Sequence, residues 1–321
     1  MKYQTVDSGQ TITVLKNEFW TSKQRAANSL HEVSYRACFK PQLPRFFIER
    51  LTQPGDLVYD PFMGRGTTLL EAVLLGRRAA GCDINPLSAI LLSPRLDPPR
   101  LEEVHDRLTE IDWDRAAALP EDLLVFYHPQ TLRQICALRE ALHGSSASID
   151  GWIRMVATNR LSGHSKGFFS VYTLPPNQAV SIESQRRINE QRKQAPEPRD
   201  VAELIRRKSK SLLRNPQPST LNAQPSTLIV TGSCDETVAI ADESVALVVT
   251  SPPFLDVVDY ETDNWLRCWF NHIESKSIKL WMFKRVDDWS LRIAAVFRAL
   301  HRILKKNGFV AFEVGEVRQG R

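Results

Sequence analysis

The chain has 321 residues and a net charge of +5, from 42 basic and 37 acidic residues. Its 42% apolar and 25% charged content is that of a globular protein with a sizeable core. No apolar run approaches the roughly 18 residues of a membrane-spanning helix, and the N-terminus shows no secretory signal. Five scattered cysteines without metal-ligand spacing exclude a disulfide scaffold and a zinc module and predict a cytoplasmic protein.

The predicted elements begin with a strand–helix–strand unit. Near-continuous apolar runs predict buried parallel strands over residues 56–60 and 78–83. Between them, residues 67–75 predict a helix with Thr67 as N-cap and Gly76 just beyond its end.

A glycine-rich turn, DPFMGRGTT at residues 60–68, follows the first strand and opens this helix. Gly64 and Gly66 permit a tight turn and the close approach of a ligand, and the helix N-terminus offers N–H groups to a carboxylate or phosphate. A third glycine is missing because position 69 is Leu, which disfavours a nicotinamide cofactor. Asp83 ends the second strand, where an acidic side chain can accept both hydroxyls of a ribose. A structural turn with a capping Asp would show the same residues.

Residues 100–228 interrupt the alternation of strands and helices. They contain predicted helices over 131–142 and 182–193, and between residues 154 and 214 they hold 13 basic and 5 acidic residues. The local net charge is therefore +8, which leaves −3 for the rest of the chain. This excess predicts contact with a polyanion, although a solvated basic helix fits it as well. A duplicated heptad over 215–228 predicts a spacer.

Three more strands are predicted over residues 227–231, 245–250 and 309–314. A helix over 291–306, stopped by the sequence Lys-Lys-Asn-Gly, precedes the last strand. Strands that alternate with helices predict a doubly wound α/β sheet. The chain stops at Arg321, directly after the fifth strand, so we expect a shortened protein.

A second loop, Ser251-Pro252-Pro253-Phe254, follows the strand over 245–250 at the edge where open α/β sheets bind ligands. Its two prolines stiffen the backbone. Phe254 can stack on a planar base while Ser251 and the Pro252 carbonyl accept hydrogen bonds from an exocyclic amino group. Holding both N–H groups directs the nitrogen lone pair toward an electrophile. An ordinary proline-rich loop would also have this sequence.

Together the two loops resemble the amino-directed DNA methyltransferases, which transfer a methyl group from S-adenosylmethionine to cytosine-N4 or adenine-N6. Residues 39–56 look like the segment that flanks the cofactor in that family, and the resemblance covers roughly residues 30–90 and 228–317. It implies an α/β fold, a Rossmann-like doubly wound methyltransferase sheet with a long, basic, partly helical insertion.

The resemblance also divides the chain into three parts. Residues 1–99 form the cofactor-binding half, and residues 229–321 form the catalytic half, shortened at its C-terminus. Residues 100–228 form an insertion with a DNA target-recognition region, over 149–214, and a linker.

The resemblance implies S-adenosylmethionine as cofactor, no metal, and two sets of site residues. The catalytic set is Ser251, Pro252, Pro253 and Phe254. The cofactor-binding set is Asp60, Phe62, Gly64, Gly66, Thr67, Asp83 and Asp235, with Asp83 on the ribose and Asp235 on the adenine ring.

Ser251, in place of Asp or Asn, resembles the cytosine-N4 branch of the family, and Phe254 replaces the commoner Tyr. We therefore expect site-specific methylation of cytosine-N4 in duplex DNA, in a restriction–modification context with a cognate restriction endonuclease as a candidate partner. The alternatives are an adenine-N6 DNA or RNA amino-methyltransferase, and a truncated, non-catalytic DNA-binding remnant. No cysteine follows a proline, which disfavours carbon-5 methylation.

Weaker candidates have equally good structural explanations. His31, Ser34, Tyr35 and Arg36 can approach the methionine end of the cofactor or form a surface helix. Asp259 and Tyr260 can line the base pocket, or cap a helix and fill the core. The remaining candidates are Trp265, Trp269 and Phe270 for base stacking, and His164 and Lys166 for phosphate contacts.

Overall fold

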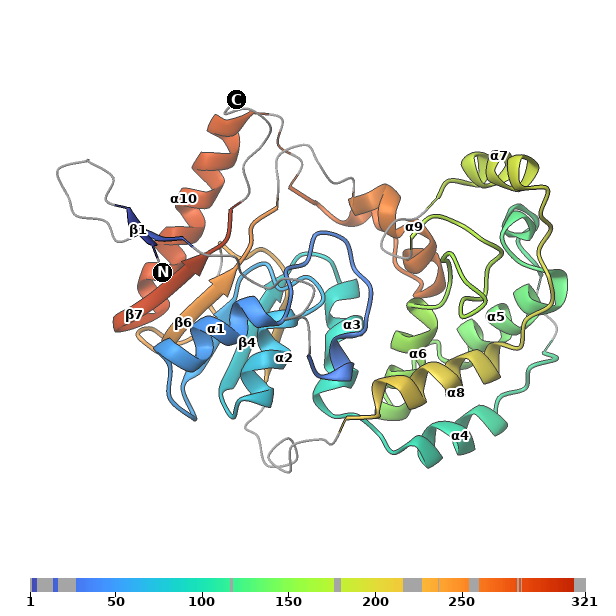
Figure 1. Ribbon diagram of the computed structural model, residues 1–321, viewed down its shortest axis with the longest axis horizontal. Helices are drawn as coiled ribbons and strands as arrows, with labels where there is room; N and C mark the ends of the chain where they lie inside the picture. The colour runs from blue at the N-terminus through green and yellow to red at the C-terminus, as the bar shows by residue number, and fades with distance from the viewer. Residues whose placement is uncertain are drawn as a thin grey trace.

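The computed structural model describes residues 2–4, 14–16, 27–115, 118–175, 180–215, 227–235, 237–253, 260–281, 283 and 285–314. Its centre is a five-stranded parallel sheet with the order β5-β4-β3-β6-β7 (Figure 1). The strands are β3 Leu57–Asp60, β4 Arg78–Asp83, β5 Leu228–Thr231, β6 Val245–Thr250 and β7 Leu304–Phe312. Two short strands, β1 Lys2–Gln4 and β2 Val14–Lys16, pair antiparallel to each other in a separate sheet.

The predicted doubly wound α/β architecture is confirmed. β4 and β6 begin and end at the predicted residues, and β3 and β5 each begin one residue later than predicted. The strand order places β3 beside β6, where the winding of the chain reverses direction along the sheet. Loops that follow neighbouring parallel strands leave the same edge, so the two predicted loops meet there.

The helices fall into two groups. Those that accompany the sheet are α1 Gln42–Leu51, α2 Thr67–Leu74, α3 Leu87–Leu96 and α10 Val286–Ile303. α9 Tyr260–Phe270 follows β6 in the chain but lies beside the insertion helices in Figure 1. Those of the insertion are α4 Leu101–Thr109, α5 Pro129–Ala141, α6 Ser148–Thr158, α7 Ile182–Arg192 and α8 Val201–Leu212. Short 3₁₀ helices span Ser29–His31, Glu121–Val125 and Ser275–Ser277. The insertion helices gather on the right of Figure 1, away from the sheet.

Both faces of the sheet are buried. Val58 of β3 and Leu247 of β6 belong to the cluster that contains Leu70 of α2. The alternate residues Tyr59 and Val248 belong to a second cluster with Val296, Leu300 and Ile303 of α10. Burial on both faces explains why these strands show no polar alternation in the sequence.

The boundary between α10 and β7 differs from the prediction. The helix was expected over residues 291–306 but spans Val286–Ile303, and β7 starts directly at Leu304. The sequence Lys-Lys-Asn-Gly lies inside β7, where the register against β6 shifts and Asn307 has a φ of 67°. A left-handed residue can form an irregularity in a strand as well as end a helix, so this stop signal was misinterpreted.

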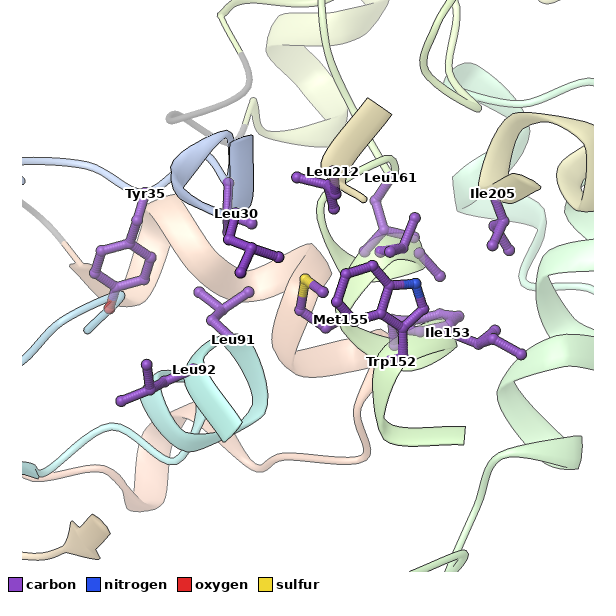
Figure 2. Packing of buried hydrophobic residues seen from close by; sticks show 14 of the residues in the cluster. Leu30, Tyr35, Leu91, Leu92, Trp152, Ile153, Met155, Leu161, Ile205 and Leu212 are labelled. Carbon is purple, nitrogen blue, oxygen red and sulfur yellow. The ribbon is translucent and has the colours of Figure 1, made fainter. Parts of the chain in front are cut away.

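The insertion packs directly onto the helices of the sheet. Figure 2 shows Trp152 and Met155 of α6 beside Leu91 of α3, and these side chains are fully buried. Ile205 and Leu212 of α8 extend the same cluster. The duplicated heptad predicted as a spacer lies, from residue 216 to 226, outside the described residues. Within the described part of the chain, no helix combines the length and apolar character needed to cross a membrane.

Candidate active site

A cleft opens at the carboxyl ends of the central strands and encloses about 910 Å³ of empty space, including its mouth. Both predicted loops contribute to its lining. The predicted site residues that line the cleft are Asp60, Phe62, Gly64, Thr67, Asp83, Ser251, Pro252 and Pro253. Phe254 lies outside the described residues.

Direct hydrogen bonds join the two loops. The Thr250 hydroxyl, at the end of β6, donates to the Asp60 carboxylate at the end of β3 over 2.6 Å. The Thr68 hydroxyl of α2 donates to the Val249 carbonyl over 3.1 Å. All four residues are buried, so the relative position of the loops is fixed by the sheet edge itself.

The start of α2 faces the cleft without a side-chain cap. Its N-cap is Gly66, with a φ of 75°, so Thr67 is the first helical residue and not the N-cap that was predicted. The first N–H groups of a helix have no partner within the helix, and they attract a carboxylate or phosphate. Gly64, with a φ of 49°, also lines the cleft.

Gly66 has a packing role rather than a place in the lining of the cleft. A Cβ atom at this position would lie 2.5 Å from Cδ1 of Leu92 in α3. The absence of a side chain therefore lets α2 and α3 pack closely. The prediction that both glycines admit a ligand is supported by the lining only at Gly64.

Two acidic side chains form the floor of the cleft. Asp60 is 1% exposed, and burial raises its pKa to about 6 although Thr250 and the Phe62 N–H donate to it. Asp83 accepts hydrogen bonds from the N–H groups of Gly64 and Asn85, each over 2.8 Å, and burial raises its pKa as well. The Gly64 bond orients the Asp83 carboxylate beside the glycine-rich turn.

The second loop is held from two sides. The Trp289 indole N–H in α10 donates to the Pro253 carbonyl over 3.0 Å. The Glu313 N–H donates to the Thr250 carbonyl over 2.8 Å, and the Glu313 carboxylate shares a hydrogen bond with Ser251. Burial raises the pKa of Glu313. A carboxylate with raised pKa beside Ser251 can accept a proton.

Sequence reasoning missed both Glu313 and Trp289. Glu313 sits at the end of the last predicted strand, so its place at the functional edge was the available signal. Trp289 falls before the predicted start of its helix, and no local pattern indicated its bond.

The opposite wall comes from the segment before α1. Tyr35 and Arg36, two of the weaker candidates, line the cleft, as does Cys38. His31 and Ser34 line a second, neighbouring cleft. Trp281, which was not predicted, lines the active-site cleft and packs edge-on against Phe62 with ring centroids 5.6 Å apart.

Asp235 is placed beside the cleft and not in its lining. Its carboxylate accepts from the Ser233 hydroxyl and pairs with Arg292 over 3.2 Å. Ser233 and Cys234 line the cleft in its place. A contact between Asp235 and an adenine ring therefore remains a prediction.

The remaining candidates mainly have structural partners. Trp265 donates to the Val180 carbonyl over 3.3 Å, Phe270 is buried, and Trp269 packs under Arg139. His164 packs near Phe168, and the Lys166 carbonyl accepts from Arg207. Asp259 and the Tyr260 side chain lie outside the described residues.

A parallel sheet with this strand order and a cleft at its carboxyl edge defines a Rossmann-like α/β class of proteins. Within that class, residues 5–89 match the DNA methylase family of N6 and N4 methyltransferases. Through this segment the chain is similar to the amino-directed methyltransferases, which use S-adenosylmethionine.

The type II methyltransferase M.MjaII of Methanocaldococcus jannaschii is 30% identical over 28% of this chain and 17% of its own length. The tRNA (guanine(10)-N2)-dimethyltransferase of the same organism is 27% identical over 35% of this chain and 38% of its own. The matched part of the chain thus spans well under half the length of these relatives. The rRNA methyltransferase aviRa of Streptomyces viridochromogenes superposes on 92% of this chain and 82% of its own, with 13% identity and a TM-score of only 0.32.

Proposed function

We propose that this protein transfers a methyl group from S-adenosylmethionine to the exocyclic N4 amino group of cytosine in duplex DNA. One observation carries the proposal: the glycine-rich turn and the Ser-Pro-Pro loop line one cleft and are joined by the Thr250–Asp60 hydrogen bond. A cofactor on one loop would therefore adjoin a base on the other.

The residues of the first loop fit the parts of S-adenosylmethionine. The uncapped start of α2 suits the methionine carboxylate. Asp83 has its carboxylate oriented by Gly64 and suits the ribose hydroxyls. Asp60, once ionised, supplies negative charge toward the positively charged sulfonium.

The second loop would hold and activate the amino group. When bound, the cofactor supplies an electrophilic methyl group on its sulfonium sulfur. Ser251 and the Pro252 carbonyl accept hydrogen bonds from the amino group and direct its lone pair toward that methyl group. Glu313, hydrogen-bonded to Ser251, accepts the proton that the nitrogen releases. Trp289 keeps the loop in place through Pro253.

Duplex DNA is proposed because type II DNA methyltransferases recur among the relatives. The target base would have to leave the stack, since its amino group is otherwise paired. Cytosine-N4 rather than adenine-N6 is proposed from Ser251. A restriction–modification context, with a cognate endonuclease as partner, is part of the same proposal.

A second candidate is an RNA amino-methyltransferase. One relative, matched over 35% of this chain, acts by its name on guanine-N2 of tRNA. The chemistry at the amino group would be the same, so the two candidates differ only in the nucleic acid.

The test is transfer of labelled methyl groups to duplex DNA and, in parallel, to tRNA, followed by nucleoside analysis. N4-methylcytosine in DNA is the expected product. N6-methyladenine would overturn the base assignment, and label in tRNA alone would favour the second candidate. Ser251→Ala should lose about 100-fold or more in rate, with Ser244→Ala, just before the start of β6 and at the opposite end of the strand, as control. Full transfer by Ser251→Ala would refute the role of Ser251.

A further inference from the structure

A second cleft lies on the other side of the segment that walls the active-site cleft. It encloses about 1000 Å³ of empty space, including its mouth. Tyr35, Ala37 and Cys38 line both clefts, so this segment separates them. We call the second space the cationic cleft.

The cationic cleft is built from two parts of the chain. Lys40 and Arg65 come from the cofactor half, and Arg160 and Lys208 come from the insertion. Glu32 is the one acidic residue in its lining, so four cationic side chains and one anionic side chain give a net charge of +3. Neither half of the chain would form this cleft alone.

Its positive charges are crowded and held in place. Arg65 donates to the Val33 carbonyl over 2.6 Å, and Arg160 packs over the Phe168 ring at 4.0 Å. Burial and the neighbouring Arg207 and Arg267 lower the pKa of Arg160 to about 10. Fixed cations that repel one another are stabilised by an anion between them.

Glu32 neutralises part of this positive charge. It pairs with Lys208 over 3.3 Å and with Arg214. A phosphate that enters the cleft would replace this carboxylate as the partner of Lys208. The wall also holds His31, which is 6% exposed and whose Nδ1 finds no hydrogen-bond partner among the described residues.

We propose that the cationic cleft binds a backbone phosphodiester of the nucleic-acid substrate, next to the nucleotide whose base enters the active-site cleft. The inference rests on the proposed function for its ligand. It assigns Lys208, Arg160 and Lys40 as phosphate contacts, with Glu32 as an internal competitor. Phosphate contacts position the substrate without reading its sequence.

The test measures binding of a fluorescent duplex DNA of mixed sequence, and of tRNA, between about 50 and 200 mM salt. Lys208→Gln should reduce the slope of log affinity against log salt by about 0.9 on DNA, because one phosphate contact is lost. Lys210→Gln, an exposed residue on the same helix outside the cleft, is the matched control and should leave the slope unchanged. Equal effects of both variants, or no effect of Lys208→Gln, would overturn the proposal.

Glu32→Gln should change nucleic-acid binding in the opposite direction to Lys208→Gln. The test therefore does not depend on a loss of binding alone. Freeing Lys208 and Arg214 should steepen the salt slope and tighten binding several-fold at low salt. Weaker binding by a folded Glu32→Gln variant would contradict the model. The nucleic acid whose binding responds to these substitutions, duplex DNA or tRNA, is the source of the phosphate.

The two proposals can fail separately. Binding that depends on Lys208 without any methyl transfer would leave the cationic cleft standing and refute the proposed function. Methyl transfer together with a salt slope that does not change in Lys208→Gln would support the proposed function and refute the cationic cleft as a phosphate site. Affinity for S-adenosylmethionine without nucleic acid should be the same in all three variants.

Discussion

Asp60 is a buried carboxyl group whose charge changes near neutral pH. Burial raises its pKa from an ordinary 3.8 to about 6, so the folded protein binds this proton more tightly than the unfolded chain does. The associated stability, about 3 kcal/mol, is complete below about pH 4 and is lost as pH rises through about 6. Asp60→Asn should therefore flatten the fall in Tm between pH 4 and 7, measured by thermal unfolding.

The same titration should govern cofactor binding. We expect S-adenosylmethionine to bind roughly tenfold more tightly at pH 7.5 than at pH 5, because an ionised Asp60 attracts the sulfonium charge. S-adenosylhomocysteine, which lacks that charge, is the control and should show a smaller change by calorimetry. Equal pH dependence of the two ligands would argue against a role for Asp60 charge.

Glu313 offers a separate residue-scale prediction, because its raised pKa and its bond to Ser251 suit a proton acceptor. At saturating cofactor, the rate of methyl transfer should fall as pH drops through this raised pKa. Glu313→Gln should lower the rate by about 100-fold and remove this acidic limb, with little change in cofactor affinity. Glu313→Asp should keep the limb. If the acidic limb of the pH–rate profile remains in Glu313→Gln, another group accepts the proton.

At the scale of elements, the two glycines of the turn should separate stability from ligand binding. Gly66→Ala places a Cβ 2.5 Å from Leu92 at a φ of 75°, so we expect a loss of about 2–4 kcal/mol in unfolding free energy. Gly64→Ala also carries left-handed strain, at a φ of 49°, but its Cβ meets only ordinary contacts, the nearest 3.6 Å away at Cys38. It should therefore lose less stability but more cofactor affinity. Adding Leu92→Ala should restore part of the unfolding free energy that Gly66→Ala loses. If the losses of the two single variants simply add in the double variant, the clash with Leu92 is contradicted.

Elements with strong local signals could be predicted from the sequence. β4 and β6 were predicted to the residue because each is a short apolar run with polar residues at its end, Arg78 and Asp83 in β4 and Thr250 in β6. The α10–β7 boundary was not, because Asn307 and Gly308 fit both a helix end and a strand irregularity. The lining of the cleft could be predicted where a single loop carries several of its residues in one sequence motif. Glu313, Trp281 and the Tyr35 wall come from distant segments, so only the folded sheet brings them to the cleft.

At the scale of the whole molecule, the insertion is part of the same core as the sheet. One continuous cluster runs from α2 and α3 through α6 to α8. Figure 2 shows the part of it that joins α3, α6 and α8. The indole of Trp152 is fully buried there and donates to the Ser209 hydroxyl over 3.0 Å. α9, which follows the Ser-Pro-Pro loop in the chain, is also tied to the insertion, because Arg139 donates to the Trp269 carbonyl. The insertion and the sheet edge that lines the cleft should therefore unfold together.

Trp152→Ala tests this coupling. Truncating a buried Trp should cost about 3–5 kcal/mol, and with a shared core the loss should appear as a lower Tm for one cooperative transition. Calorimetry with and without S-adenosylmethionine is the measurement. In our proposal the cofactor binds only the sheet half. Because the insertion shares its core with the sheet, cofactor binding should stabilise the insertion of the wild type as well. Two separate transitions, with only one shifted by the cofactor, would mean that the insertion is an independent unit despite its shared packing.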